Sequence, residues 1–387
     1  MSTSPTLPPL SLYIHVPFCV HKCPYCDFHS TVEKNIPLDS YLAAVKSELA
    51  FWRQNLCDDN RPLHSIFFGG GTPSILDGET IGQILFEIKQ LWQLSPKGEI
   101  TLESNPESCN PQKIEQWLHS GVNRLSIGIQ AFSQKRIDSL GRPHSLAEAQ
   151  QAIKYSRQGG FSNINLDLMF ATPSQSIKEW QEELAEAMSW QPQHLSCYSL
   201  TIEKNTPFAK LQMQGKLLNL SEEDEIAFFT TTRQTLESAG WQGYEISNFA
   251  QPGQECQHNL NYWRSGDYIG VGPSAHGRLT KIENNIITVE RIINKTIGYK
   301  DGSWLQEKTI CSTTESGNDC LMMGLRTREG MSRKTYKNLS GADLLTQQPE
   351  IVKELQSADL LTVTQEKIAL TNKGVLLCDT ILEKLIT

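Results

Sequence analysis

The sequence predicts an α/β fold, a partial (β/α)6 barrel followed by a small C-terminal winged-helix-like domain. Short apolar runs recur along the first 200 residues, each bounded by turn residues. Amphipathic helical patterns fill the gaps, and this alternation indicates parallel strands joined by crossover helices. The alternation stops after about residue 205, where shorter patterns begin.

Six apolar runs are the expected barrel strands. Several are apolar on consecutive positions, which is typical of strands buried on both faces of a parallel sheet. The runs are Leu12–Val16, Ser65–Phe68, Ile100–Glu103, Arg124–Ile129, Ile164–Phe170 and His194–Leu200. Ligands of such barrels bind at the C-terminal ends of the strands, so a site is expected there.

Helices are expected between these strands, and several begin with a residue that can cap the first turn. The expected helices are Ser40–Trp52, Thr80–Leu94, Pro111–Ser120, Leu146–Gln158 and Ile177–Met188. The capping candidates are Asp39 or Ser40, Asn110, Ser145 and Ser176. Gly121 and the pair Gly159-Gly160 stand where helices should end.

The rest of the chain is expected to differ from the barrel. One more helix is predicted over Ser221–Gly240, and residues 245–280, rich in Gly, Asn and Tyr, are expected to be irregular. A helical segment from about 312, a hairpin at Leu360–Thr371 and a last helix at Asn372–Ile386 are typical of a winged-helix-like module. We therefore expect a core at 1–240, an irregular segment that completes the pocket at 241–300, and the C-terminal domain at 301–387.

Composition narrows the class of protein. The formal net charge of −8 argues against a broad phosphate-binding surface, so we expect no nucleic-acid partner. No apolar run approaches the roughly 20 residues that span a bilayer, and the first residues lack the pattern of a secretory signal. We expect a cytoplasmic protein, in which the ten cysteines are thiols or metal ligands rather than disulfides.

Three cysteines with the spacing C-x3-C-x2-C are the sharpest chemical signal. Cys19, Cys23 and Cys26 directly follow the first expected strand, so one short loop can bring three thiolates together. Iron–sulfur clusters take four ligands, typically all cysteines, so three would leave one iron open for chemistry. A zinc site completed by His21 or His29 is the alternative.

This spacing after the first strand resembles the radical S-adenosylmethionine (SAM) superfamily, and the resemblance extends along most of the chain. It implies a radical SAM barrel with a 4Fe-4S cluster whose open iron binds SAM. It also implies that a reduced flavodoxin or ferredoxin supplies the electron that cleaves the sulfonium bond. By the same resemblance, aromatic residues Tyr13 and Tyr25 would lie beside SAM.

The expected SAM-binding residues lie after successive strands. Phe68–Ser74, with the sequence FGGGTPS, follows the second strand, and its glycines let backbone N–H groups approach a ligand. Acidic, amide and basic side chains follow further along, and charges at strand ends need a partner or a ligand to offset desolvation. The family resemblance implies that Gly70, Gly71 and Thr72 meet the amino-acid end of SAM. Glu103, Gln130, Arg142 and Asp167 occur together along successive strands, and this position predicts that they complete the SAM pocket.

Within the superfamily the chain resembles the branch of the oxygen-independent coproporphyrinogen III oxidase and, in that branch, the haem chaperone family HemW. The oxidase pattern continues to a fourth cysteine, where this chain has Phe28, and the oxidase carries an extension before its cluster, whereas Cys19 lies almost at the start here. His258–Trp263, HNLNYW, matches the H-N-x-x-Y-W motif of HemW.

His258 is the expected haem ligand, because a neutral imidazole suits haem iron and nearby Tyr262 and Trp263 offer aromatic surface to the macrocycle. Cys256 is an alternative ligand, and His276 is expected nearer SAM or substrate than haem. The resemblance further implies haem-acceptor proteins, with respiratory proteins at a membrane surface as the expected class, and a homodimer.

We therefore expect a haem chaperone that binds haem and transfers it to acceptor proteins on a radical SAM scaffold. No catalytic residue is assigned, and no coproporphyrinogen oxidase activity is expected. Three alternatives stay open, since such motifs define a radical generator better than its target. They are the oxidase itself, another SAM-cleaving radical enzyme, and a binding module that keeps SAM only as a structural ligand.

Overall fold

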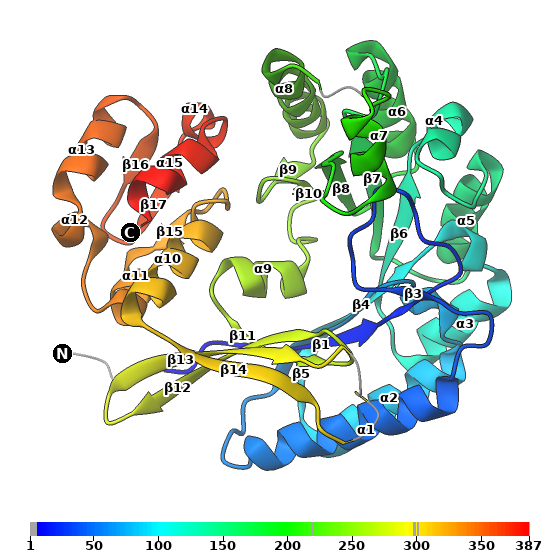
Figure 1. Ribbon diagram of the computed structural model, residues 1–387, viewed down its shortest axis with the longest axis horizontal. Coiled ribbons are helices and arrows are strands. Elements are labelled where there is room, and N and C mark those ends of the chain that lie inside the picture. Colours follow the sequence, from blue (N-terminus) through cyan, green and yellow to red (C-terminus); the bar gives the residue numbers. More distant parts are fainter. Residues whose placement is uncertain (1–5, 218–219, 297–298, 300–301, 387) are drawn as a thin grey trace.

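The computed structural model describes residues 6–217, 220–296, 299 and 302–386, and its main feature is one open 12-stranded sheet (Figure 1). Six neighbouring strands of this sheet are parallel and have crossover helices between them, which confirms the partial barrel. They are β1 (Leu10–Val16), β4 (Leu63–Gly70), β5 (Leu94–Ser104), β6 (Arg124–Gln130), β7 (Ile164–Phe170) and β8 (His194–Ser199).

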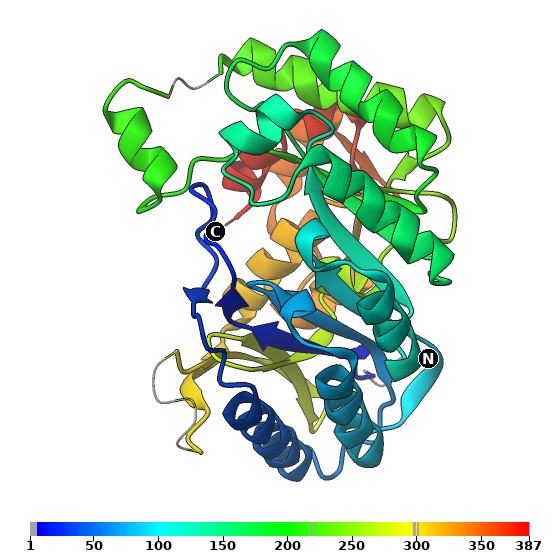
Figure 2. The same cartoon turned by 90° about the vertical axis from the view of Figure 1, so that its right-hand side faces the viewer.

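Helices cover the outer face of this curved sheet (Figure 2). They are α1 (Leu38–Asn55), α2 (Gly78–Leu91), α3 (Pro111–Ser120), α4 (Gln134–Ser139), α5 (Leu146–Gln158), α6 (Ile177–Ser189) and α8 (Glu222–Ser238), with 3-10 turns η1 (Pro73–Ile75) and η2 (Pro106–Ser108). A short helix, α7 (Pro207–Met213), projects from the sheet instead (Figure 2). Asn110, Ser145 and Ser176 cap their helices as expected. The expectation for Asp39 or Ser40 is wrong, because α1 begins at Leu38, directly after Pro37, so both residues lie inside the first turn and no side chain caps it.

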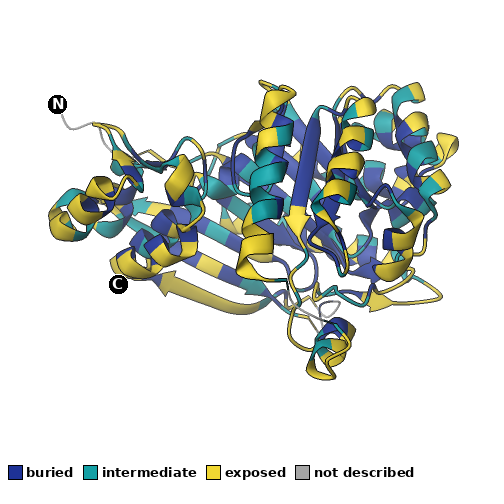
Figure 3. Ribbon diagram, turned by 90° about the horizontal axis from the view of Figure 1, so that it is seen from above, coloured by how far each residue is buried: buried dark blue, intermediate teal, exposed yellow. Residues whose placement is uncertain are grey.

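The core lies between the sheet and these helices (Figure 3). The apolar runs of the strands are almost completely buried, whereas the helices bury one face and expose the other. Trp117 of α3 and Trp180 of α6 are fully buried against the sheet. Burial of such large side chains is the main favourable term that holds the layers together.

The region expected to be irregular contains regular elements that widen the sheet on both sides. β9 (Gln242–Gly243) and β10 (Asn248–Ala250) add to β8, and β11 (Asp267–Val271) pairs in parallel with β1. β12 (His276–Glu283), β13 (Ile286–Asn294) and β14 (Leu305–Cys311) continue antiparallel, and α9 (Gln257–Trp263) lies over this part. The glycine at position 270 interrupts the apolar pattern of β11, so the sequence did not predict this strand. The structure requires a glycine there, because any side chain would collide with the carbonyl of His276.

The C-terminal part has its own hydrophobic core and a three-stranded sheet. Its elements are α10 (Thr313–Gly324), β15 (Met331–Ser332), α11 (Arg333–Ser340), α12 (Leu344–Gln347), α13 (Pro349–Ser357), β16 (Leu361–Val363), β17 (Lys367–Leu370), α14 (Asn372–Val375) and α15 (Cys378–Leu385). The expected hairpin is present as β16–β17, and the expected last helix is divided into α14 and α15. In the described ranges, no helix is long and apolar enough to cross a membrane.

Candidate functional site

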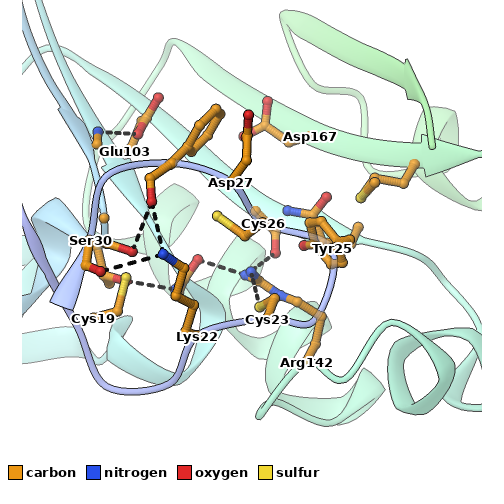
Figure 4. A pocket seen from close by; sticks show the side chains of 18 of the residues that line it. Cys19, Lys22, Cys23, Tyr25, Cys26, Asp27, Ser30, Glu103, Arg142 and Asp167 are labelled. Carbon is orange, nitrogen blue, oxygen red and sulfur yellow. Dashed lines mark hydrogen bonds between the residues drawn. The ribbon is translucent and has the colours of Figure 1, made fainter. Parts of the chain in front are cut away.

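The three cysteines lie on a loop at the C-terminal end of β1, as the sequence predicts. β2 (Phe18–Cys19) and β3 (Thr31–Val32) pair in parallel and hold the two ends of this loop together. Figure 4 shows that Cys19, Cys23 and Cys26 all face one cavity of ≈ 470 Å³. We call it the cysteine cavity. The projecting helix α7 lies beside the loop, where the Phe208 N–H donates to the Pro24 carbonyl (Figure 2).

The residues around the sulfurs fit a 4Fe-4S cluster. In the described part of the chain, no three His, Cys, Asp or Glu side chains are close enough to hold a single metal ion, as zinc would require. A 4Fe-4S cluster does not require the three sulfurs to converge on one ion, because each cysteine binds a different iron. Gly71 keeps space open beside the loop, since a Cβ there would lie 2.6 Å from the Phe18 carbonyl and 3.0 Å from Cys19 Sγ.

Hydrogen-bond donors already face two of the three sulfurs. Arg142 Nη1 donates to Cys23 Sγ at 3.4 Å, and Thr72 Oγ1 donates to Cys19 Sγ at 3.6 Å. Such donors stabilise thiolate charge and tune the potential of a bound cluster. Burial raises the pKa of the Cys26 thiol, and a bound metal would stabilise its thiolate.

Asn105 joins these groups into one network that sequence reasoning missed. Its Oδ1 accepts from Arg142 Nη2 at 2.7 Å, and its Nδ2 donates to Thr72 Oγ1 at 3.2 Å. The signal that could have found it is its position directly after the third strand, two residues beyond Glu103. Arg142 Nε is buried and has no partner among the described residues, so it can serve an anionic group of a ligand.

Two carboxyl groups form the opposite wall of the cysteine cavity (Figure 4). Glu103 Oε2 accepts from the Gly70 N–H at 3.2 Å, and Asp167 accepts from Ser126 Oγ at 3.0 Å and Asn165 Nδ2 at 2.8 Å. Burial and the charge of Asp167 raise the pKa of Glu103 to about 8, and burial raises the pKa of Asp167. A cationic ligand would offset the mutual repulsion of these carboxylates.

The structure brings most of the expected SAM residues together but not all of them. Gly70, Gly71, Thr72, Glu103, Gln130, Arg142, Asp167 and Tyr25 all line the cysteine cavity. Gln130 has the uncommon backbone φ of 66°, which turns the chain at the end of β6. Tyr13 is outside this lining: its hydroxyl bonds to His15 Nδ1 at 3.1 Å, and its ring faces a second cavity.

The second cavity, of ≈ 910 Å³, lies between the sheet, α9 and α10, and we call it the α9 cavity. Figure 1 shows α9 between the sheet and the C-terminal helices. The lining of the α9 cavity includes Tyr262, Trp263, His276, Arg278, Arg291 and Met322. The two cavities adjoin, because Phe28, Gly70 and Glu103 line both of them.

His258, the expected haem ligand, lies behind the wall of the α9 cavity. Its side chain is only 1% exposed, its Nδ1 bonds to Ser65 Oγ at 2.8 Å, and its Nε2 bonds to the Tyr262 hydroxyl at 2.8 Å. Burial lowers the pKa of His258 to about 3, so the ring is neutral at physiological pH. Cys256 is also buried and donates to Glu99 Oε1 at 3.2 Å, whereas His276 is exposed.

Comparison with known proteins shows the family and the fold to which this chain is similar. Residues 13–187 match the Radical SAM superfamily and residues 312–377 match the HemN C-terminal domain. The heme chaperone HemW of Haemophilus influenzae is 36% identical over 99% of this chain and 99% of its own length, and HemW of Escherichia coli K12 is 36% identical over 97% and 98%. The solved structure of the coproporphyrinogen III oxidase HemN from Escherichia coli, described as a radical SAM enzyme, has a TM-score of 0.81. It covers 98% of this chain and 91% of its own, at 21% identity, which shows a shared fold.

Proposed function

The chain belongs to the HemW family of radical SAM proteins, and from this premise we propose that it binds haem and transfers it to haem-requiring proteins. The observation that carries the proposal is the α9 cavity, which lies beside the cysteine cavity and is walled by aromatic and histidine side chains. Its volume of ≈ 910 Å³ is at the upper end of the range of about 300–1,000 Å³ for ligand sites, which suits a large flat macrocycle.

The cysteine cavity is proposed to hold the 4Fe-4S cluster and SAM that the superfamily implies. Cys19, Cys23 and Cys26 would bind three irons, Arg142 and Thr72 would stabilise two of the sulfurs, and Glu103 with Asp167 would face the cationic end of SAM. When bound, the cluster supplies a single electron to SAM. The carboxyl groups and Gln130, which line the same cavity, would orient the cofactor.

Partners and surroundings extend the same proposal. A reduced flavodoxin or ferredoxin would supply the electron, and respiratory haem proteins at a membrane surface would accept the haem. A homodimer is proposed by resemblance to the family. All ten cysteines are free thiols, which suits work in a reducing cytosol.

Anaerobic haem titration of the full, cluster-reconstituted chain tests the function. We expect a Soret band that saturates at a fixed haem-to-chain ratio, and transfer of that band to an apo haem protein added in excess. The control is the same titration with Cys57→Ser, which removes an exposed thiol outside both cavities. Conversion of coproporphyrinogen to protoporphyrinogen without haem binding would instead support the oxidase.

A further inference from the structure

We propose that His276, not His258, binds the haem iron, and that His258 is a positioning residue that holds Tyr262 in the wall of the α9 cavity. This inference rests on the proposed haem function and names the ligand at that site. Three observations support it: the hydrogen bonds of the two imidazole rings, the aromatic lining of the α9 cavity, and the guanidinium groups at the edge of that cavity.

Neither ring nitrogen of His258 is available to a metal. Ser65 Oγ donates to Ser11 Oγ at 2.8 Å, so it accepts from His258 Nδ1, and Nε2 is left to accept the Tyr262 hydroxyl. The ring is also stacked on Phe67 at 5.0 Å and packed edge-on against Tyr262 at 4.8 Å. A metal bond at Nε2 would require the Tyr262 ring to leave and its hydroxyl to lose a partner, which is costly in a buried site.

His276 meets the requirements that His258 does not. It is exposed, it lines the α9 cavity, and its ring makes no hydrogen bond with the described residues. Its backbone is fixed all the same, because it pairs with Ile293 of β13 and its carbonyl packs on Gly270 of β11. A free imidazole on a rigid strand is suitably preorganised for a metal ligand.

The walls beside His276 fit a porphyrin in both shape and charge. The rings of Tyr262 and Tyr268 meet edge-on at 4.4 Å, and Met322 and Met323 of α10 add flexible apolar surface. Trp263 Nε1 is buried and has no partner among the described residues, so the wall retains a donor for a polar group. Arg278 and Arg291 also line the cavity, where Asp267 binds Nη1 of Arg278 and Asp319 binds Nε and Nη2 of Arg291. The other N–H groups of the two guanidinium groups are left for carboxylates such as haem propionates.

The role left to His258 is to hold this wall. Its Nε2 fixes the hydroxyl of Tyr262, and the Tyr262 ring in turn packs against Tyr268. Loss of His258 would therefore loosen an aromatic wall of the cavity and weaken haem binding without removing the iron ligand. A lower haem affinity would result from a loosened wall as well as from a lost iron ligand, so affinity alone cannot distinguish these two causes. Spectra that report the iron ligand can distinguish them.

The test uses the full, reconstituted chain and ferric haem, with visible and electron paramagnetic resonance spectra as the readout. We expect His276→Gly to lose the signature of imidazole-ligated haem, and free imidazole to restore it. His258→Ala and Tyr262→Phe should keep that signature while haem binds more weakly. His119→Ala removes an exposed imidazole on α3, outside both cavities, and should match the unsubstituted protein.

The outcomes separate the two proposals. If the unsubstituted protein binds no haem, the proposed function fails. If it binds haem and His276→Gly keeps the signature, the assignment of His276 is wrong while the function stands. Should His258→Ala prove unstable, the imidazole rescue of His276→Gly still decides, because that side chain is exposed and its removal leaves the core intact.

Discussion

Glu103 and the backbone N–H of Gly70 are joined by a hydrogen bond of 3.2 Å at the point where the two cavities meet. Glu103 is the penultimate residue of β5, Gly70 is the last residue of the neighbouring β4, and both residues line both cavities. A ligand that moves the Glu103 carboxyl in one cavity therefore also alters a wall of the other. This contact is a direct physical link between the proposed SAM site and the proposed haem site.

Replacement of Glu103 by Gln should change how stability depends on pH. The pKa of Glu103 is raised to about 8 in the folded protein, so its contribution to stability is full below the unfolded pKa of about 4.3 and is lost as pH rises toward 8. Glu103→Gln carries no such group. Between pH 5 and pH 8 the unsubstituted protein should therefore lose on the order of 3–4 kcal/mol of unfolding free energy that Glu103→Gln does not lose.

Chemical denaturation of the ligand-free protein at both pH values measures this difference. Glu148→Gln is the control, because Glu148 is exposed and the hydrogen bonds of the Ser145 cap lower its pKa. A difference between Glu103→Gln and the unsubstituted protein that stays constant from pH 5 to pH 8 would contradict the raised pKa.

Serine at any one of the three loop cysteines should abolish cluster assembly. Each of Cys19, Cys23 and Cys26 faces the cysteine cavity, and two protein ligands hold a cluster poorly. Iron and sulfide analysis after anaerobic reconstitution should fall from about four of each per chain to near zero. Cys57→Ser should keep the full content, because Cys57 is exposed and lies outside the cavity. Full iron content in Cys26→Ser would contradict the assignment.

Arg142→Met should lower the reduction potential of the bound cluster. The substitution removes both the positive charge and the N–H that faces Cys23 Sγ at 3.4 Å, and each of these favours the reduced, more negative cluster. A redox titration followed by electron paramagnetic resonance measures the potential. Arg326→Met removes a charge of the same sign that is paired with Asp379 in the C-terminal part, and it should leave the potential unchanged. An unchanged potential in Arg142→Met would show that its hydrogen bond does not reach the cluster.

Two substitutions in α9 should distinguish the stability that one hydrogen bond contributes from the stability that the whole buried imidazole of His258 contributes. Tyr262→Phe removes only the partner of His258 Nε2 and should lower the free energy of unfolding by about 1 kcal/mol. His258→Ala also strips Ser65 of a partner and opens a cavity, and should cost about 3 kcal/mol. Denaturant titration of the haem-free protein gives both values, and an exposed control, His119→Ala, should stay within about 0.5 kcal/mol. Equal losses in the two α9 variants would contradict the buried position of His258.

Arg291 should contribute to haem affinity through a propionate. Its guanidinium lines the α9 cavity, is exposed and is paired with Asp319 of α10. Since a charge-assisted hydrogen bond is worth about 1.5–3 kcal/mol, we expect Arg291→Gln to weaken haem binding roughly tenfold or more. Haem dimethyl ester, which lacks the carboxylates, should bind the unsubstituted protein and Arg291→Gln equally. If Arg291→Gln also bound haem dimethyl ester tenfold more weakly than the unsubstituted protein does, Arg291 would not act through a propionate.

Local signals in the sequence determined much of the barrel. Apolar runs such as Ile164–Phe170 match β7, and the caps at Asn110, Ser145 and Ser176 form as expected because each depends only on residues within one helical turn. The cysteine loop was equally visible, since one short segment after β1 carries all three thiols. Most of the residues that line the cysteine cavity were predicted from their positions at strand ends, because parallel strands bring their C-terminal ends to one edge of the sheet.

Only the tertiary structure decided which aromatic and histidine side chains reach which cavity. Tyr13 turns to the α9 cavity, whereas His258 is buried and has its Nδ1 bonded to Ser65, 193 residues away on β4. The strands within 245–280 were likewise hidden, since Gly270 is required there by the backbone of the neighbouring strand. Contacts between segments far apart in the chain leave no periodic pattern in either segment, so the accessibility of an imidazole is settled by packing alone.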